Sequence, residues 1–184
     1  MAAHLKLCVA GPGRSGKTLI SNLIGGHGGD APGPYDETVG CRILETELNT
    51  DGKSADGRRV ERNVRVSVEI WDLGDQRFEK CWMAVSRGLH GLVVVYDPNN
   101  RAHDADLQYW FRWGQEHAKL DPRQFLVVAN AGRDGKLPAS LPRPLDKVHT
   151  VRFVAEDPGH LRNEVNEFAG VLFGFHPDAE FLDD

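Results

Sequence analysis

Eight residues near the start of the chain have the types and spacing of a phosphate-binding loop. They read Gly11-Pro12-Gly13-Arg14-Ser15-Gly16-Lys17-Thr18 and match the pattern G-x-x-x-x-G-K-[ST]. Glycine tolerates the backbone angles that turn N–H groups toward a phosphate, the lysine supplies a point charge for the outer phosphates, and the threonine oxygen can ligate Mg²⁺. An apolar strand at residues 5–10 and a helix at 17–24 flank the loop, and this context favours a nucleotide site over a glycine-rich turn without a ligand.

A carboxylate that could complete a metal site ends a later strand. Residues 64–71 alternate between apolar and polar side chains, which is typical of a half-exposed strand, and Asp72 follows them. Proteins with a phosphate-binding loop hold Mg²⁺ with an aspartate at such a strand end. A single aspartate there could also be a turn or helix-cap residue, but its place after two predicted strands favours the metal. We therefore expect Thr18 and Asp72 to lie near one Mg²⁺ ion.

The elements that must position these residues alternate between strands and helices. Apolar patterns predict strands at residues 5–10, 41–49, 64–71, 92–96, 125–129 and 149–154, and helices near 17–24, 78–85, 104–119 and 161–172. This order predicts an α/β fold: a three-layer P-loop NTPase with a six-stranded, mostly parallel sheet, one antiparallel edge strand and helices on both faces. Residues 1–175 form the expected domain, and residues 176–184 form an acidic C-terminal tail.

Length and charge restrict the class of protein. The 184 residues suit about one domain of roughly 150 residues. With 22 basic and 27 acidic residues the net charge is −5, which argues against a nucleic-acid partner and against a polybasic membrane patch. We expect no secretory signal, no membrane span and no prenylated C-terminal cysteine, hence no direct membrane anchor. Three cysteines without paired spacing favour a reducing, cytoplasmic compartment.

Several motifs, in their order and spacing, resemble a Rab-type small GTPase. These are the loop at residues 11–18, then Thr38-Val39-Gly40, then Ile70-Trp71-Asp72. Further segments narrow the resemblance to the Rab-like small GTPase subunit of the intraflagellar transport B complex: Gly40-Cys41-Arg42-Ile43-Leu44-Glu45, Phe78-Glu79-Lys80-Cys81-Trp82 and His90-Gly91-Leu92. The resemblance covers residues 5–173. The phosphate loop is generic to NTPases, whereas the segment 78–82 is more specific to the family.

The resemblance implies the ligands and the site residues. It implies GTP as the nucleotide and Mg²⁺ as the metal, with Thr38 joining Thr18 and Asp72 at the metal and sensing the γ-phosphate. The nucleotide-binding residues that it implies are Gly13, Arg14, Ser15, Gly16, Lys17, Thr18, Leu19, Thr38, Gly74, Asn130 and Asp134.

The segment after Asp72 departs from the Rab pattern. Only four residues, 73–76, separate Asp72 from Arg77-Phe78, where Rab proteins have five. Counting forward from Asp72 puts Gln76 at the position of the catalytic, water-orienting glutamine. Counting back from Arg77 puts Gly74 at the γ-phosphate glycine and Asp75 at the glutamine position. We prefer the second register, because packing of the following helix fixes it. An aspartate there cannot orient water as glutamine does, so we expect slow hydrolysis.

The guanine-recognition segment also departs from the family. In place of N-K-x-D the chain reads Asn130-Ala131-Gly132-Arg133-Asp134, so the asparagine is in place, the lysine is missing and the aspartate comes one position late. Asp134 either binds the guanine base or is a turn residue before Gly135. Three prolines and two glycines within residues 130–147 predict no long helix, so we expect the fourth helix of ordinary small GTPases to be missing.

These features favour a GTP-binding adaptor of the intraflagellar transport B complex. The resemblance implies coiled-coil subunits as partners, and the cytoplasm, the cilium or flagellum and its base as the location. We expect a monomer until it is partnered. The alternatives are a hydrolytic switch with Gln76 catalytic, a nucleotide kinase, and a scaffold that binds no nucleotide. Tyr109 and Trp113 form either a surface pair that covers the edge of the core or a patch that binds a partner.

Overall fold

The computed structural model describes residues 3–27, 37–53, 58–74, 79–132 and 141–175. The elements follow the chain in this order: β1 (Ala3–Ala10), α1 (Lys17–Ile24), β2 (Cys41–Lys53), β3 (Arg59–Leu73), α2 (Glu79–Ser86), β4 (Gly91–Tyr96), α3 (His103–His117), β5 (Phe125–Asn130), β6 (His149–Phe153) and α4 (Pro158–Phe175). The six strands form one sheet in the order β2-β3-β1-β4-β5-β6. Only β2, at one edge, runs antiparallel to its neighbour, which confirms the predicted fold class.

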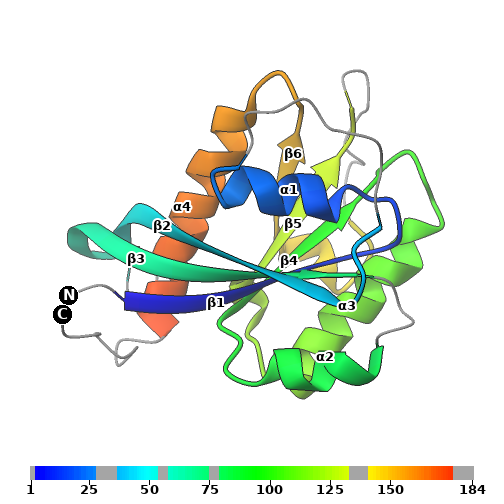
Figure 1. Cartoon of the computed structure of the whole chain (residues 1–184), viewed down its shortest axis with the longest axis horizontal. Helices are drawn as coiled ribbons and strands as arrows, with labels where there is room; N and C mark the ends of the chain where they lie inside the picture. Colours follow the sequence, from blue (N-terminus) through cyan, green and yellow to red (C-terminus); the bar gives the residue numbers. More distant parts are fainter. Residues whose placement is uncertain (1–2, 28–36, 54–57, 75–78, 133–140, 176–184) are drawn as a thin grey trace.

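Helices cover both faces of the sheet, so the domain has three layers (Figure 1). Buried side chains of α1 and α4 pack on one face, and those of α2 and α3 pack on the other. The central strands β4 and β5 are buried along almost their whole length, as expected for parallel strands covered from both sides. The carboxyl ends of the parallel strands therefore meet at one edge of the sheet, and loops at this edge can form a site.

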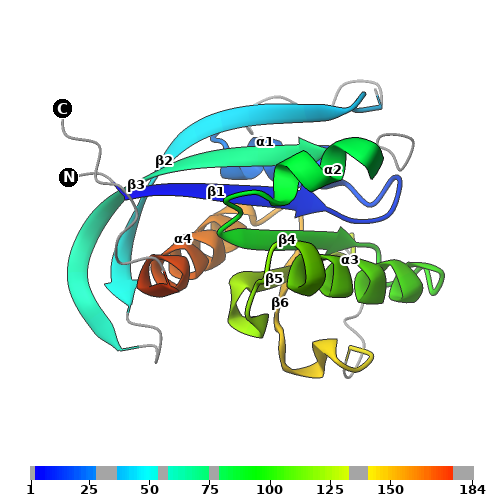
Figure 2. The ribbon, with the colours of Figure 1, turned by 90° about the horizontal axis from the view of Figure 1, so that it is seen from below.

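The β2–β3 hairpin is longer than the sequence predicts. β2 continues to Lys53 and β3 begins at Arg59, beyond the predicted strands at 41–49 and 64–71. The reason is support from α4, which lies beside the outer part of the hairpin (Figure 2). Thr50 Oγ1 donates a hydrogen bond to the backbone oxygen of Asn166, 2.5 Å away. Polar residues whose sequence predicts a loop are thus held in strands by a helix that is distant in the sequence.

The described residues between β5 and β6 contain no α-helix. Residues 141–148 include only a 3₁₀ turn at Leu145–Lys147, so this part agrees with the predicted absence of a fourth helix. Residues 133–140, which complete that prediction, lie outside the described residues. Within the described residues α4 is the helix that follows β6.

The aromatic residues of α3 pack inward. The rings of Trp110 and of Trp82 in α2 have centroids 4.5 Å apart, and both side chains are buried. Trp113 is also buried, so its assignment to a surface pair with Tyr109 is wrong. The 3₁₀ turn at Leu145–Lys147 lies against α3 and contributes the buried Leu145 to the same core. Tyr109 is half-buried and donates its hydroxyl to Glu79.

None of the helices in the described part of the chain combines the length and the apolar composition needed to span a bilayer.

Candidate functional site

The loop between β1 and α1 has the backbone shape that its glycines permit. Gly11 has φ +144°, and a Cβ there would lie 2.1 Å from the backbone oxygen of Val95. Gly16 has φ +94° and immediately precedes α1. Only glycine adopts these angles without strain and permits such close contact. The loop thus follows a buried strand and leads into a helix N-terminus, the arrangement that binds phosphate groups.

Lys17 and Ser15 line this loop. Lys17 Nζ donates a hydrogen bond to the carbonyl of Pro12, 2.8 Å away, so the ammonium group is held against the loop itself. Ser15 is buried, and its hydroxyl makes no hydrogen bond within the described residues. A buried hydroxyl without a partner costs free energy, which a ligand atom at this loop would recover.

Asn130, at the end of β5, holds the loop from the neighbouring side. Its Nδ2 donates to the backbone oxygen of Ser15, 3.0 Å away. A Cβ on Gly16 would lie 2.4 Å from that same nitrogen, so the asparagine packs directly against the loop backbone. The structure therefore brings Asn130 to the phosphate loop, and its amide nitrogen supports the loop's shape.

Three oxygen-bearing side chains from separate segments meet beside the loop. Thr18 lies in the first turn of α1, Thr38 precedes β2, and Asp72 lies near the end of β3. The hydroxyl oxygens of Thr18 and Thr38 are 2.9 Å apart, and Thr18 donates to Asp72 Oδ2 at 3.0 Å. Since Thr18 gives its one proton to Asp72, Thr38 must donate to Thr18. All three side chains predicted to hold the metal are therefore in one hydrogen-bonded chain.

Asp72 is the charged centre of this group. Its side chain is 0% exposed, and burial raises the pKa of its carboxyl, against the hydrogen bond from Thr18 and the charges of Arg42 and Lys17, which lower it. Its Oδ2 accepts two hydrogen bonds, whereas its buried Oδ1 accepts none from the described residues. A carboxylate with a free, buried oxygen is suited to a cation or to a water bound to one.

The donor set fits Mg²⁺. Hydroxyl and carboxylate oxygens are the ligands that Mg²⁺ takes from proteins, usually with one or two carboxylates and with substrate phosphates. Within the described ranges no group of three or more His, Cys, Asp or Glu side chains could hold a metal. A metal site here would therefore consist of Thr18, Thr38 and Asp72, and would be completed by phosphate oxygens and water.

Gly74 joins the end of β3 to the segment before β2. Its N–H donates to the backbone oxygen of Gly40, 2.9 Å away. A Cβ on Gly74 would lie 2.1 Å from the backbone oxygen of Thr38. The two segments that the resemblance assigns to the γ-phosphate thus contact each other through backbone atoms, and only glycine allows this distance.

The remaining predicted residues are partly outside the described structure. Gln76, the alternative Asp75 and Asp134 lie beyond the described residues, so the register after β3 and the contact with a base stay predictions. Leu19 is partly buried and packs against the core beneath α1. Gly13 and Arg14 are exposed on the loop.

Sequence reasoning missed Arg42, which contacts Asp72, and Asn22, which holds Arg42. Arg42 of β2 donates from its guanidinium to Asp72 Oδ2 at 3.2 Å and to Asn22 Oδ1 at 2.7 Å. Only the register of the antiparallel hairpin, in which Arg42 and Asp72 are direct partners, could have pointed to Arg42. Asn22 could not be found this way, since its position depends on how α1 packs over the sheet.

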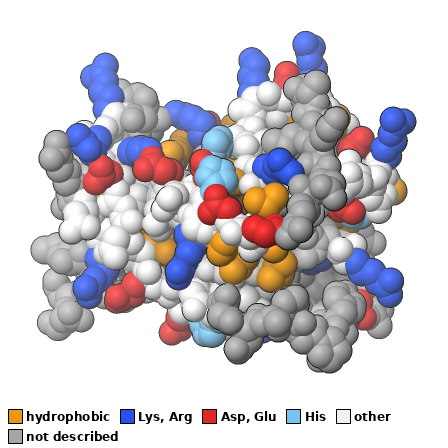
Figure 3. Space-filling model, turned by 90° about the horizontal axis from the view of Figure 1, so that it is seen from above, with side chains coloured by type: hydrophobic (Ala, Val, Ile, Leu, Met, Phe, Trp, Pro, Cys, Tyr) orange, Lys and Arg blue, Asp and Glu red, His pale blue; other side chains and the backbone are white. Residues whose placement is uncertain are grey.

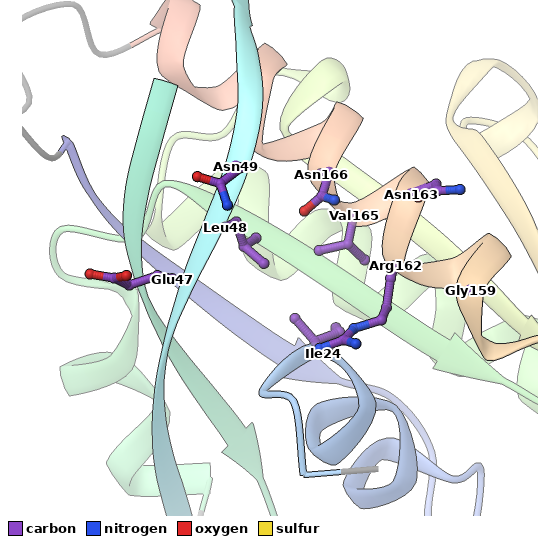
Figure 4. Close-up of a pocket in the computed structure, with 9 residues that line it drawn as sticks. All are labelled: Ile24, Glu47, Leu48, Asn49, Gly159, Arg162, Asn163, Val165 and Asn166. Atoms are coloured by element: carbon purple, nitrogen blue, oxygen red, sulfur yellow. The ribbon is translucent and has the colours of Figure 1, made fainter. Parts of the chain in front are cut away.

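A separate groove of about 360 Å³ lies between β2, the end of α1 and α4. Its floor is apolar, with Ile24, Leu48 and Val165, and Arg162 and Asn163 of α4 lie at its rim (Figure 4). It includes none of the predicted site residues. This groove is therefore a different feature from the loop and carboxylate described above.

Two of the cysteines, Cys8 and Cys41, offer no activated thiol. Cys8, Cys41 and Cys81 are all free. Burial raises the pKa of Cys41 to about 11 and raises that of Cys8 well above its ordinary value. Both thiols are therefore protonated at neutral pH and are poor nucleophiles.

The molecular face seen in Figure 3 carries basic and acidic side chains interspersed. Among the described residues visible there, basic side chains form no continuous area like the one a phosphate backbone requires.

Comparison with known proteins gives consistent matches. Residues 6–132 match the family model "Ras of Complex, Roc, domain of DAPkinase". The chain is 32% identical over 165 residues to the intraflagellar transport protein 22 homologue of Bos taurus, an alignment that covers 86% of this chain and 84% of the relative. It is 29% identical over 175 residues to that of Danio rerio, covering 90% and 88%. Identity to intraflagellar transport protein 22 of Trypanosoma brucei brucei is 28% over 109 residues, covering 59% and 50%.

Proposed function

The chain belongs to the intraflagellar transport protein 22 family and contains a Ras-like Roc GTPase domain, and we propose that it is a GTP-binding adaptor. The observation that carries the proposal is the convergence of Thr18, Thr38 and Asp72 beside a phosphate-binding loop. Three segments far apart in the sequence meet there. They bring the oxygen ligands that Mg²⁺ takes from a protein when it is bound to a nucleoside triphosphate.

The residues divide between phosphate and metal. Backbone N–H groups of residues 13–19 and the ammonium of Lys17 would bind the phosphates, after Lys17 exchanges the carbonyl of Pro12 for phosphate oxygens. Thr18 and Thr38 would ligate Mg²⁺ with their hydroxyls, and Asp72 through water. Bound there, Mg²⁺ would neutralise phosphate charge and hold the γ-phosphate in place. Gly74 would offer its N–H to that phosphate after exchanging the backbone oxygen of Gly40 for a phosphate oxygen.

Guanine specificity rests on the segment after β5. We propose that Asn130 mainly keeps the loop in its phosphate-binding shape, because its amide nitrogen bonds to the loop backbone. Asp134 would accept hydrogen bonds from the guanine N1–H and N2–H₂ groups. A test is Asp134→Ala, which should remove the preference for guanine over adenine nucleotides and leave phosphate binding intact.

We expect hydrolysis to be slow, because the preferred register places Asp75 where related GTPases place a glutamine. A hydrolytic switch with Gln76 catalytic is the alternative. Gln76→Leu separates the two: single-turnover GTP hydrolysis should barely change for the adaptor, and should collapse if Gln76 orients the attacking water.

The adaptor role is proposed from the names of the relatives and from the surface beside Thr38. Those relatives are named for intraflagellar transport. Val39, directly after the residue that would sense the γ-phosphate, is 76% exposed, and Ile43 in β2 is 49% exposed. Because Gly74 ties this segment to β3, loss of the γ-phosphate would move an exposed apolar surface. We propose that coiled-coil subunits of the intraflagellar transport B complex bind there in the GTP state, in the cytoplasm and in the cilium or flagellum and its base.

The deciding experiment is a titration of fluorescent GTP, GDP and ATP analogues with Mg²⁺ against wild type and Lys17→Ala. Lys147→Ala, at an exposed position in a 3₁₀ turn, is the control for loss of one lysine charge. Guanine-selective binding that is lost only in Lys17→Ala would support the proposal. If ATP bound as tightly as GTP, the proposed selectivity for guanine nucleotides would be wrong. If the folded wild-type protein bound no nucleotide, the adaptor proposal would fail, and a scaffold that binds no nucleotide would be the better description.

A further inference from the structure

Arg42 lies on the buried carboxylate that the metal would use. The two residues are direct partners across the β2–β3 ladder, and the guanidinium donates to Asp72 Oδ2 at 3.2 Å. The same guanidinium nitrogen, Nη2, also donates to Asn22 Oδ1 at 2.7 Å, so a side chain of α1 holds it as well. The sheet register and a helix side chain together fix a cation at this place.

The Arg42 guanidinium supplies to Asp72 the positive charge that a metal ion would otherwise supply. Asp72 is 0% exposed, and a buried carboxylate without a counter-charge is strongly destabilising. The nearby cation of the phosphate loop, Lys17, donates to the carbonyl of Pro12. Arg42 contacts the same oxygen, Oδ2, that accepts from Thr18, so a positive charge already lies within the predicted metal site.

The guanidinium of Arg42 can also move away from Asp72. Its side chain is 38% exposed, whereas that of Asp72 is fully buried, so the guanidinium can move toward water while the carboxylate cannot. Two cations beside one carboxylate repel each other at short range, and the repulsion is strong where water is excluded. Mg²⁺ binding would therefore either displace Arg42 or proceed against its charge.

We propose that Arg42 is a tethered cation that competes with Mg²⁺ for Asp72, stabilises the metal-free protein and lowers its affinity for Mg²⁺. The inference rests on the proposed function, since Mg²⁺ enters there with the nucleotide. Its consequence is that retention of the nucleotide requires a higher Mg²⁺ concentration than it would without the arginine. Arg42 is thus a residue that tunes metal affinity through Asp72.

The test is the Mg²⁺ concentration at which a bound fluorescent GDP analogue is half retained, measured for wild type and Arg42→Ala. A hydrogen bond to a charged group is strong enough that its removal should lower this midpoint by about tenfold or more. The matched control is Arg65→Ala on β3, which removes an exposed arginine that lies 3.8 Å from Glu47 in the same hairpin. Its midpoint should equal that of wild type. If Arg42→Ala fails to fold, Arg42→Gln, which keeps an amide donor without the charge, should show the lower midpoint.

A second readout uses no nucleotide. In chelator Arg42→Ala should unfold at a lower temperature than wild type, and added Mg²⁺ should raise its Tm by more than it raises that of wild type. Equal midpoints in proteins that retain GDP would overturn the inference and leave the proposed function standing. If no variant binds a guanine nucleotide, the proposed function fails. The inference is then decided by the Mg²⁺-induced Tm shift alone, and an equal shift in both proteins refutes it.

Discussion

Replacing Gly74 with alanine should separate the two segments that meet at the metal site. The added Cβ would lie 2.1 Å from the backbone oxygen of Thr38 and 2.9 Å from that of Gly40. Both distances are far below an ordinary carbon–oxygen contact, and both oxygens belong to the backbone. The segment at residues 38–40 must therefore move, and the hydrogen bond from the Gly74 N–H to Gly40 is lost or strained.

The size of the effect follows from this clash. Forcing an extra methyl group into a packed site costs about 1–3 kcal/mol. In a domain of this length each kcal/mol shifts the Tm by about 2–4 °C, so the expected decrease is roughly 2–12 °C. Thr38→Ala in the same protein should not relieve the clash, because the methyl group meets the backbone oxygen of residue 38 and not its side chain.

The assay is thermal unfolding of the nucleotide-free protein, followed by circular dichroism, for wild type, Gly74→Ala and Gly159→Ala. Gly159 is the control, since the nearest atom to a Cβ there is Asp157 Oδ1 at 3.7 Å, and its substitution should cost nothing. If Gly74→Ala unfolds within about 1 °C of wild type, the two segments are not in contact and the argument for their coupling is wrong.

Three further predictions concern Asp72, Asn130 and Gly170. Burial raises the pKa of Asp72, so the protonated side chain favours the folded state. This contribution to the free energy of unfolding is complete below the pKa that Asp72 has in the unfolded chain, and it is lost as pH rises through the pKa that Asp72 has in the folded protein. Asp72→Asn should therefore raise the Tm of metal-free protein at neutral pH, by a margin that shrinks toward pH 4, while weakening Mg²⁺-dependent nucleotide binding. Asn130→Ala removes the bond to the phosphate loop, and isothermal titration should show nucleotide affinity about threefold to tenfold lower. Gly170→Ala brings a methyl group 2.4 Å from the backbone oxygen of Asp51, so urea unfolding should show a loss of about 1–2 kcal/mol, whereas Gly159→Ala on the same helix should show none.

The fold class could be predicted from the sequence because its determinants are local. Buried parallel strands are continuous apolar runs, amphipathic helices have a 3.6-residue period, and the glycines around Lys17 define one kind of loop. The six strands, four α-helices and antiparallel edge of the part that the structure describes follow from these patterns.

The candidate metal site was predictable in part for the same reason. Thr18 and Asp72 each occupy a recognisable place beside a local motif, and the structure brings them within hydrogen-bonding distance. Arg42 carried no local signal, since an arginine on an edge strand is ordinary. Its meaning depends on the register that places it opposite Asp72.

Other features depended on contacts between elements distant in the sequence. Trp113 resembles a surface residue on a helical projection, yet it is buried in the same core cluster as Leu141, Leu145 and Val148 of the segment before β6. The hairpin extends past Asn49 because α4 supports it through Thr50.

The sequence by itself determined the phosphate loop, the order of the elements and the residue types of the metal site, because backbone angles and hydrophobic periods are local properties. Only the tertiary structure decided which cation lies on Asp72, how Gly74 meets Thr38, and what Asn130 bonds to. These depend on strand register and on the packing of α1 against the sheet, which bring together atoms that are dozens of residues apart in the chain.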